Sequence, residues 1–183
     1  MRITKNLRAD QDNIKRFLAA LGGGSVALSS KLARPSFFIY AHGFITEYIE
    51  GFFKKEELLI HALEEGGFPP DDGPIRLMRT DQKKSREAAQ LMLDAAKQWQ
   101  AGDESARPEV SWATSEYTST IRTHLDRLKN LIFPLLEQTI TIEEEHKVSE
   151  GINNIVFEGA LKDGPEKYLK MIEALEEELS DWQ

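Results

Sequence analysis

Residues 38–63 have the sequence FIYAHGFITEYIEGFFKKEELLIHAL, in which apolar residues recur every three or four positions. This spacing is typical of one face of an α-helix, so it predicts a helix from about Pro35-Ser36 to about Glu65. Gly66-Gly67 is expected to end this helix, because glycine favours the backbone conformations of helix ends. The predicted inward positions are Phe38, His42, Ile45, Ile49, Phe52, Glu56, Leu59 and Leu63.

The same periodicity extends toward both ends of the chain. Apolar residues from Leu7 to Leu21 predict a first helix, and Gly22-Gly23-Gly24-Ser25 is expected to end it as a loop. A third helix is predicted to begin at Pro74 and to run to about Trp99, since proline fits the first turn of a helix. These helices are separated by short glycine- and proline-containing links.

The remaining sequence predicts three more helices. Residues 102–108 are polar and read as a loop, after which a fourth helix is expected to start near Ser111. Pro134 lies inside the pattern of this helix and predicts a kink or break there. Thr141-Ile142-Glu143-Glu144 has the spacing of a capping box, which predicts a fifth helix through about Leu161.

After a stop and start at Asp163-Gly164-Pro165, a last amphipathic helix is predicted from Glu166 to about Leu179. No stretch alternates with a period of two, so no sheet is expected. The sequence therefore predicts an all-α protein with a single domain over residues 1–183. Residues 1–138 would form an up-and-down four-helix bundle, and residues 139–183 a C-terminal extension of two helices.

The composition excludes several classes of function. The chain has 183 residues, 40% hydrophobic and 30% charged, with a net charge of −8, so it should repel nucleic acid phosphates. It contains no cysteine, which excludes disulfides, thiolate metal sites and cysteine nucleophiles. The charged N-terminus is no secretory signal, and no apolar run approaches the ~20 residues of a membrane span. We therefore expect a cytoplasmic protein with no nucleic acid or membrane partner. No Gly-x-Ser-x-Gly pattern is present, so an enzyme with a catalytic triad is not expected.

Polar residues interrupt the apolar stripe of each of the first four helices. Inward polar side chains from several helices of a bundle can converge on a metal ion. They can equally form a hydrogen-bonded core layer, since a buried polar group without a partner costs ~1–3 kcal/mol. The periodicity leaves both interpretations open. The interrupting residues are Gln11, His42, Glu56, Gln82 and His124.

Several segments resemble those of a known family. Gly66-Gly67-Phe68-Pro69 and Gly73-Pro74-Ile75-Arg76-Leu77-Met78 resemble the inter-helix link of hemerythrin-like proteins of the HHE cation-binding type. Residues 54–59 with Ala62-Leu63-Glu64 resemble its second-helix motif, and His124-Leu125 with residues 131–135 resembles its closing motif. Residues 7–21 have the shape of its opening helix. Residues 164–168, Gly-Pro-Glu-Lys-Tyr, are similar to the tail of longer bacterial members. The chain thus resembles a divergent hemerythrin-like protein.

The resemblance implies a non-haem di-iron site, held by histidines and bridging carboxylates, that binds oxygen or senses oxygen or iron. Two of the implied ligands are retained, Glu56 and His124. The implied histidines of the other helices fall at Gln11, Phe52 and Gln82, and an acidic ligand falls at Leu128. If the second-helix alignment shifts by one residue, Phe53 and Glu57 are the pair and the histidine is still missing. Phenylalanine and leucine cannot bind iron, and glutamine is a weak ligand beside imidazole.

The preferred interpretation is a hemerythrin-like bundle with a degenerate, metal-free site and no cofactor. Such a bundle would act as a binding or regulatory module for a protein partner or for a small apolar ligand near Phe52. The alternative is an iron-binding hemerythrin-like protein with unorthodox ligands. These would be Glu56, His124, Gln11, Gln82 and either Asp10 or Asp81. A ferritin-like carboxylate site is set aside, because neither Glu56 nor Glu57 has a histidine three residues later.

Overall fold

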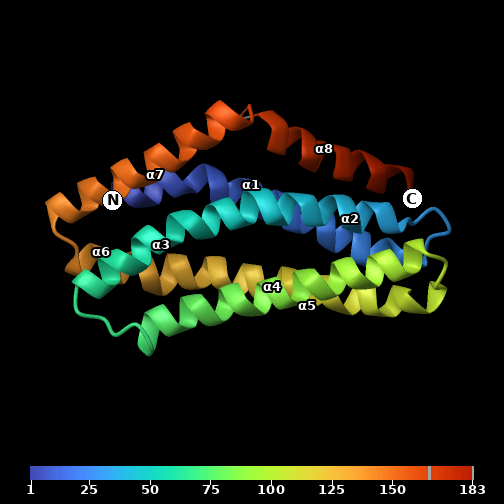
Figure 1. The fold of residues 1–183 in the computed structure, drawn as a ribbon, viewed down its shortest axis with the longest axis horizontal. Helices are drawn as coiled ribbons and strands as arrows, with labels where there is room; N and C mark the ends of the chain where they lie inside the picture. The colour runs from blue at the N-terminus through green and yellow to red at the C-terminus, as the bar shows by residue number, and fades with distance from the viewer. Residues whose placement is uncertain (165, 183) are drawn as a thin grey trace.

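The computed structural model describes residues 1–164 and 166–182, and these residues form helices with no strand. Consecutive helices are joined end to end into long rods, which lie side by side and alternate in direction (Figure 1). Four such rods form the bundle. The predicted all-α fold, a four-helix bundle with two additional helices, is confirmed. The first rod is α1 (Arg2–Val26), and the second joins α2 (Pro35–Phe44) to α3 (Glu50–Glu65) through the π-helical turn η2 (Ile45–Ile49). The third rod is α4 (Gly73–Gln100), and the fourth joins α5 (Arg107–Arg127) to α6 (Phe133–Thr139) through the π-helical turn η4 (Leu128–Ile132).

The predicted loop at Gly22-Gly23-Gly24-Ser25 is wrong, because α1 continues through it to Val26 before the short 3-10 turn η1 (Ala27–Ser29). A Cβ on Gly24 would lie 2.4 Å from Cε1 of the buried Phe37, and one on Gly23 would lie 3.0 Å from Cδ1 of Leu179. Glycine here lets neighbouring side chains approach the backbone of α1. It does not turn the chain.

The fourth rod also begins earlier than predicted. The 3-10 turn η3 (Glu104–Ala106) leads into α5 at Arg107, not near Ser111. Pro108 lies in the first turn of α5, where its missing N–H needs no intrahelical partner. Farther along, η4 interrupts the α-helix and ends at Ile132, two residues before Pro134. This is the position where a proline removes one backbone hydrogen bond and crowds the preceding turn.

The two C-terminal helices are α7 (Ile142–Lys162) and α8 (Glu166–Asp181). The predicted capping box is present at the start of α7: Thr141 Oγ1 accepts from the Glu144 N–H, and the Glu144 carboxylate accepts from the Thr141 N–H. The predicted stop and start before α8 is described up to Gly164 and from Glu166, since Pro165 lies outside the described residues.

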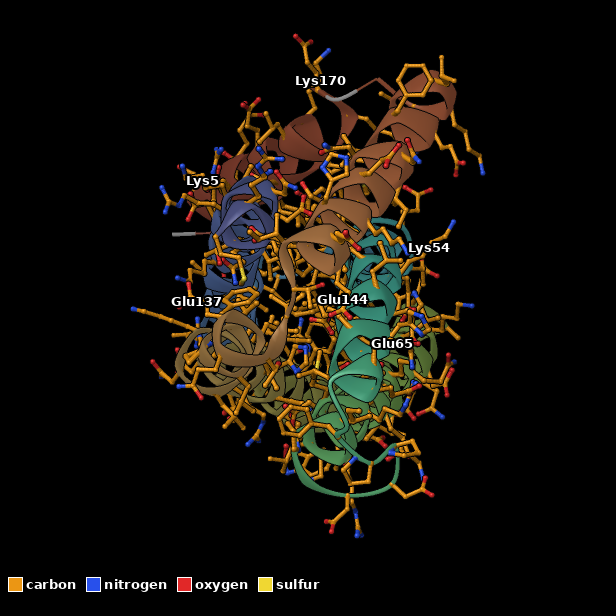
Figure 2. All side chains as sticks on the ribbon, turned by 90° about the vertical axis from the view of Figure 1, so that its left-hand side faces the viewer. Lys5, Lys54, Glu65, Glu137, Glu144 and Lys170 are labelled. Carbon is orange, nitrogen blue, oxygen red and sulfur yellow. The ribbon has the colours of Figure 1, made fainter. Side chains whose placement is uncertain are left out.

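These helices cover the seam between the first two rods. α7 packs on α1 and α3, and α8 packs on α1 and α2, on one side of the bundle (Figures 1 and 2). The ring of Trp182, which follows α8, lies 4.9 Å from the ring of Phe37 between centroids. On the exposed side of α8, Glu176 forms an ion pair with Arg16 of α1, and Glu178 forms one with Arg34, which precedes α2.

None of the helices in the described residues combines the length and the apolarity that a bilayer crossing needs.

Candidate functional site

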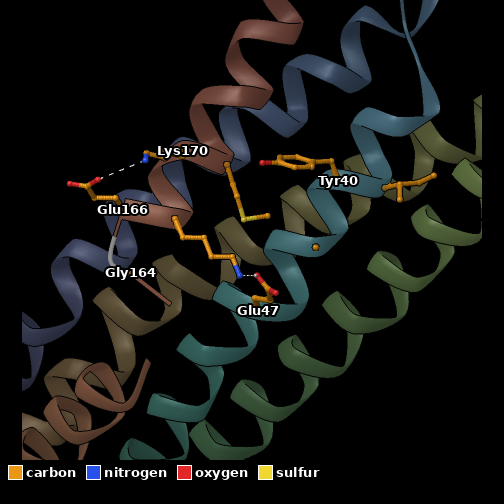
Figure 3. Close-up of a pocket in the computed structure, with 9 residues that line it drawn as sticks. Tyr40, Glu47, Gly164, Glu166 and Lys170 are labelled. Carbon is orange, nitrogen blue, oxygen red and sulfur yellow. Dashed lines mark ion pairs between the residues drawn. The ribbon is translucent and has the colours of Figure 1, made fainter. Parts of the chain in front are cut away.

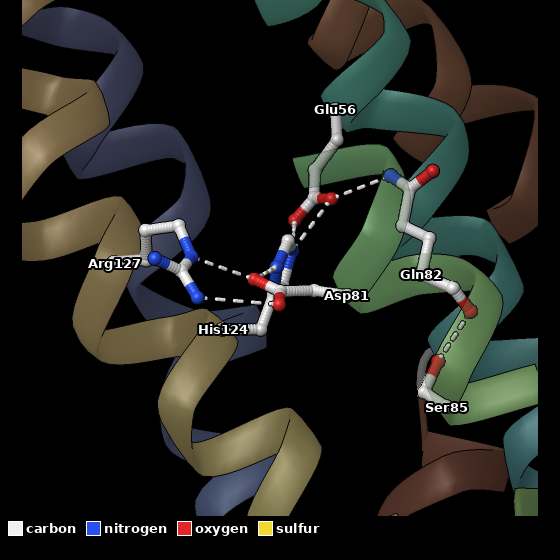
Figure 4. Close-up of polar contacts among 6 residues, drawn as sticks. All are labelled: Glu56, Asp81, Gln82, Ser85, His124 and Arg127. Carbon is white, nitrogen blue, oxygen red and sulfur yellow. Dashed lines mark hydrogen bonds and ion pairs between the residues drawn. The ribbon is translucent and has the colours of Figure 1, made fainter. Parts of the chain in front are cut away.

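Four polar side chains meet in the interior of the bundle. Glu56 comes from α3, Asp81 and Gln82 from α4, and His124 from α5 (Figure 4). Their exposed fractions are 0% for Glu56, 7% for Asp81, 3% for Gln82 and 1% for His124. Burial this deep requires that each polar atom finds a partner within the protein.

His124 lies between two carboxylates. Its Nε2 is 2.8 and 2.7 Å from the two oxygens of Glu56, and its Nδ1 is 3.0 Å from Oδ2 of Asp81. Ionised carboxylates only accept hydrogen bonds, so between two of them both ring nitrogens donate and the ring is an imidazolium cation. Gln82 donates from Nε2 to Glu56 at 2.8 Å. The amide thereby satisfies a carboxylate oxygen without adding charge.

Arg127 completes this group from one turn farther along the fourth rod. Its Nε donates to Oδ2 of Asp81 at 2.8 Å and its Nη2 to Oδ1 at 3.4 Å. The two carboxylates thus face two cations, and the charges balance. We call Glu56, Asp81, Gln82, His124 and Arg127 the ion-pair layer.

The titration of His124 reflects these neighbours. Burial alone lowers the pKa of its imidazole, but the charge of Glu56 and the hydrogen bonds to Asp81 and Glu56 outweigh it and raise the pKa to about 9. For Asp81, burial acts to raise the pKa, yet the hydrogen bonds from His124 and Arg127 bring it below its usual value. Both shifts favour the charged forms, so His124 and Asp81 are ionised at neutral pH.

A second polar cluster lies beside this layer, between α1 and the second rod. The Lys55 ammonium pairs with the carboxylate of Asp10. Tyr48 donates its hydroxyl to Asp10 at 2.7 Å, and Asn13 donates to the Tyr48 oxygen at 3.0 Å. Burial and the charge of Asp10 raise the pKa of Tyr48 above its usual value. The polar group that α1 turns toward its neighbour is therefore Asp10. The adjacent Gln11 is half-buried and takes no part in the ion-pair layer.

The structure brings together only some of the positions that the resemblance singles out. Glu56, Gln82 and His124 are in direct contact. Phe52 and Leu128 are packed in the apolar core with exposed fractions of 2% and 0%.

Two members of the ion-pair layer stand apart from those positions. The sequence predicts Asp81 only as an alternative ligand, and the periodicity assigns no role to Arg127. A signal for Arg127 existed, since it lies three residues after His124 and so on the same helix face.

The residues present do not fit a di-iron centre. Each ring nitrogen of His124 is bonded to a carboxylate, and because the two nitrogens lie on opposite edges of the ring, Glu56 and Asp81 do not converge on one point. Phe52 and Leu128 offer no lone pair. Within residues 1–164 and 166–182, no group of three or more His, Asp or Glu side chains has an arrangement that could hold a metal ion.

An open pocket of the surface lies elsewhere, between α2 and the start of α8 (Figure 3). Its charged groups pair with each other: Lys167 lies 3.1 Å from Glu47, and Lys170 lies 4.0 Å from Glu166. Phe52 does not line this pocket. The small apolar ligand expected near Phe52 therefore remains a prediction.

The comparison with protein families gives one match. The model of the hemerythrin HHE cation-binding domain matches residues 2–136, which include all four rods up to α6. No curated protein and no solved structure matches the chain. Since the family match covers most of the chain and the fold is a helical bundle, this chain belongs to the hemerythrin HHE cation-binding family.

Proposed function

We propose that this hemerythrin-like bundle works without metal, as a binding or regulatory module and not as an enzyme. The proposal rests on the two hydrogen bonds of His124, whose ring nitrogens both donate to buried carboxylates. A histidine binds a metal ion through an unprotonated ring nitrogen. Here a metal ion would have to displace a proton from a ring with a pKa of about 9 and also break a buried hydrogen bond.

The charge balance supports the same proposal. A carboxylate buried without a cation is very costly, so a bundle that lost its iron would need another source of positive charge. In this chain, His124 and Arg127 supply two positive charges to Glu56 and Asp81. The ion-pair layer thus takes over the structural role that the family gives to metal.

The position of the layer favours binding over catalysis. Its carboxylates and imidazole are at most 7% exposed, so a substrate has no direct access to them. Function is then expected at the surface. Residues 139–183 contain 12 acidic and 4 basic residues, whereas residues 1–138 contain 19 of each, so the whole net charge of −8 lies in the C-terminal extension. The extension is the chemically distinct surface of the molecule and the expected contact for a protein partner.

Thermal unfolding with and without metal tests the proposal. The full chain is dialysed against a strong chelator, divided, and supplied with excess Fe(II) under anaerobic conditions. We expect the two midpoints to agree within about 1 °C, because a metal that does not bind the folded state cannot stabilise it. A metal present at 100 times its dissociation constant would add about 2.7 kcal/mol and raise the midpoint by about 5–10 °C.

Surface binding needs its own control. His146 is exposed beside Glu143 and Glu145 and could bind Fe(II) weakly. The variant His146→Asn therefore goes through the same comparison. A stabilisation by Fe(II) that persists in this variant and disappears in Glu56→Gln would place iron in the ion-pair layer and contradict the proposal.

A further inference from the structure

The last helix, α8, lies along the seam between α1 and α2 (Figure 1). Its bundle-facing side chains recur at intervals of four, three, four and three residues, the pattern by which an amphipathic helix docks on a partner. At one end of the seam, the ring of Trp182 lies 4.9 Å from that of Phe37 between centroids. At the other end, the ring of Tyr168 lies 5.1 Å from that of Tyr48. The bundle-facing side chains are Tyr168, Ile172, Leu175, Leu179 and Trp182.

The surface beneath α8 admits a helix at close range. A Cβ on Gly23 of α1 would lie 3.0 Å from Cδ1 of Leu179, so glycine at this position lets α8 approach the backbone of α1. A Cβ on Gly43 of α2 would lie 3.8 Å from Cε of Met171, in ordinary contact. We call this surface the α8 seam. It consists of Gly23, Phe37, Phe38, Gly43, Phe44 and Tyr48.

Ion pairs flank the apolar stripe of α8 on both sides. At about 100° per residue, Glu176 lies on one flank of the stripe and Glu178 on the other. Glu176 pairs with Arg16 of α1 at 2.5 Å. Glu178 pairs with Arg34, which precedes α2, at 2.9 Å. The rim of the α8 seam is therefore complementary to a helix with carboxylates on both flanks. A third pair, on the same flank as Glu178, is Lys167–Glu47.

The connection of α8 to the bundle makes its release inexpensive. In the described part of the chain, no residue between Ile152 of α7 and Ile172 of α8 is buried. Of the sixteen residues of α8, two are buried, Ile172 and Leu175. Its ion pairs are exposed, and exposed pairs contribute little to stability. Opening of α8 therefore breaks the contacts of α8 alone and leaves the four rods packed on each other.

We propose that the α8 seam docks an acidic amphipathic helix of a partner protein and that α8 is its displaceable, autoinhibitory occupant. The partner helix presents large apolar side chains at the spacing found in α8, with carboxylates toward Arg16 and Arg34. A second copy of this chain is a poorer occupant, because its identical helix competes with an internal α8 whose effective concentration is on the order of millimolar. The site names the partner class of the proposed binding function and rests on that function.

The first test uses a fluorescently labelled peptide of residues 166–182 and the full chain, with binding measured by anisotropy. Glu176→Gln/Glu178→Gln in the chain weakens the internal α8 and leaves Arg16 and Arg34 for the peptide. We expect this variant to bind the peptide about fivefold more tightly than the wild type does. The matched control is Glu173→Gln/Glu177→Gln, which makes the same change of charge on the exposed face of α8 and should leave the affinity unchanged.

A larger release is expected from Ile172→Ala/Leu175→Ala in the chain. Loss of two buried side chains raises the open fraction of α8, so the unchanged peptide should bind about 100-fold more tightly than it binds the wild type. A peptide that itself carries Ile172→Asp/Leu175→Asp should bind neither chain, because both buried contacts with the α8 seam are lost.

Hydrogen exchange of the wild-type chain tests the opening without any substitution. The backbone amides of α8 should exchange faster than those of α4. Raising NaCl from about 0.05 to about 1 M should increase the rate in α8 and leave that in α4 unchanged, because salt screens the exposed ion pairs.

Several outcomes overturn the proposal. One is a peptide that does not bind the Ile172→Ala/Leu175→Ala chain at concentrations up to about 1 mM. Another is equal affinity for the wild type and Glu176→Gln/Glu178→Gln, and a third is exchange of α8 at the rate of α4. A wild-type dimer that the peptide dissociates, detected by sedimentation velocity, would assign the α8 seam to a second copy. These measurements involve no metal, so their failure is distinguishable from a failure of the metal-free proposal, which iron binding alone decides.

Discussion

Protonation of His124 stabilises the centre of this bundle, because without that charge two buried carboxylates would face a neutral ring. Breaking a buried ion pair by removing one partner typically costs about 3–5 kcal/mol, since the remaining charge stays buried. The same reasoning applies to Arg127, whose loss would leave Asp81 with one cation in place of two. At the scale of residues, then, each charged side chain of the ion-pair layer needs its neighbours of opposite charge to remain buried.

The stability of the protein should fall as the pH rises through the alkaline range. The pKa of His124 is raised from 6.5 to about 9 in the folded protein, so the folded state holds this proton more tightly than the unfolded chain does. The resulting stabilisation is complete below pH 6.5, declines between pH 6.5 and 9, and is absent above that range. At 1.4 kcal/mol per unit, it is on the order of 3 kcal/mol. Chemical denaturation between pH 6 and 10 measures it.

His124→Gln is the control for this pH dependence. The variant should be less stable than the wild type at pH 7, and it should lose the decline in the free energy of unfolding between pH 7 and 9. A wild-type decline that the variant retains in full would assign it to other groups. The Asp81 carboxyl behaves in the opposite sense, because its pKa is lowered, and its contribution is lost only in acid.

Sequence reasoning found part of this layer. The period of the helices placed Glu56, Gln82 and His124 on inward faces, and the three side chains do meet. It did not pair Asp81 with Arg127, because spacing along one helix says nothing about which positions face each other across two helices. That register is set by the packing of whole helices.

At the scale of elements, glycine serves two different purposes in this protein, one at helix boundaries and one inside α1. Gly67, Gly73 and Gly102 have positive φ angles at helix boundaries, as sequence reasoning expects of glycine. Gly24 instead lies inside a helix with its α-carbon against the ring of Phe37. The sequence alone cannot distinguish the two uses, because the second depends on a residue thirteen positions away that packs from another helix.

Substituting two glycines of α1 by alanine should have effects of opposite sign. Gly24→Ala places a Cβ 2.4 Å from a ring carbon of Phe37, and this ring is confined by Trp182 and Phe38, so we expect a loss of about 1–3 kcal/mol. Gly22→Ala meets only Arg122 at 3.9 Å and gains helix propensity, so we expect a stabilisation of about 0.5–1 kcal/mol. Urea denaturation of the two variants measures both. Equal effects of the two substitutions would show that close packing at Gly24 is unimportant.

The other element boundaries were predicted to different degrees. The second rod, α4 and the capped start of α7 were found from periodicity and end signals. The start of α5 lies earlier than the sequence predicts, because the polar, proline-containing stretch before it predicts a loop although proline also fits the first turn of a helix. Local signals thus locate helices well where periodicity and capping agree.

At the scale of the whole molecule, the proposed metal-free bundle relies on two features in place of a metal centre. The ion-pair layer neutralises the buried charges, while Phe52 and Leu128 fill apolar volume around it. The C-terminal helices then close the seam between the first two rods, with Ile172, Leu175 and Trp182 buried beneath them. Under the proposed function, packing and these internal ion pairs hold the bundle together without a metal ion.

The metal content of the purified chain tests this account most directly. The full-length protein is produced in iron-supplemented medium, purified without chelator, and analysed for iron and other transition metals by inductively coupled plasma mass spectrometry against protein concentration from amino-acid analysis. We expect iron far below one atom per chain, because His124 offers no free ring nitrogen and Phe52 and Leu128 offer no ligand atoms. Iron close to two atoms per chain, lost in Glu56→Gln, would contradict it.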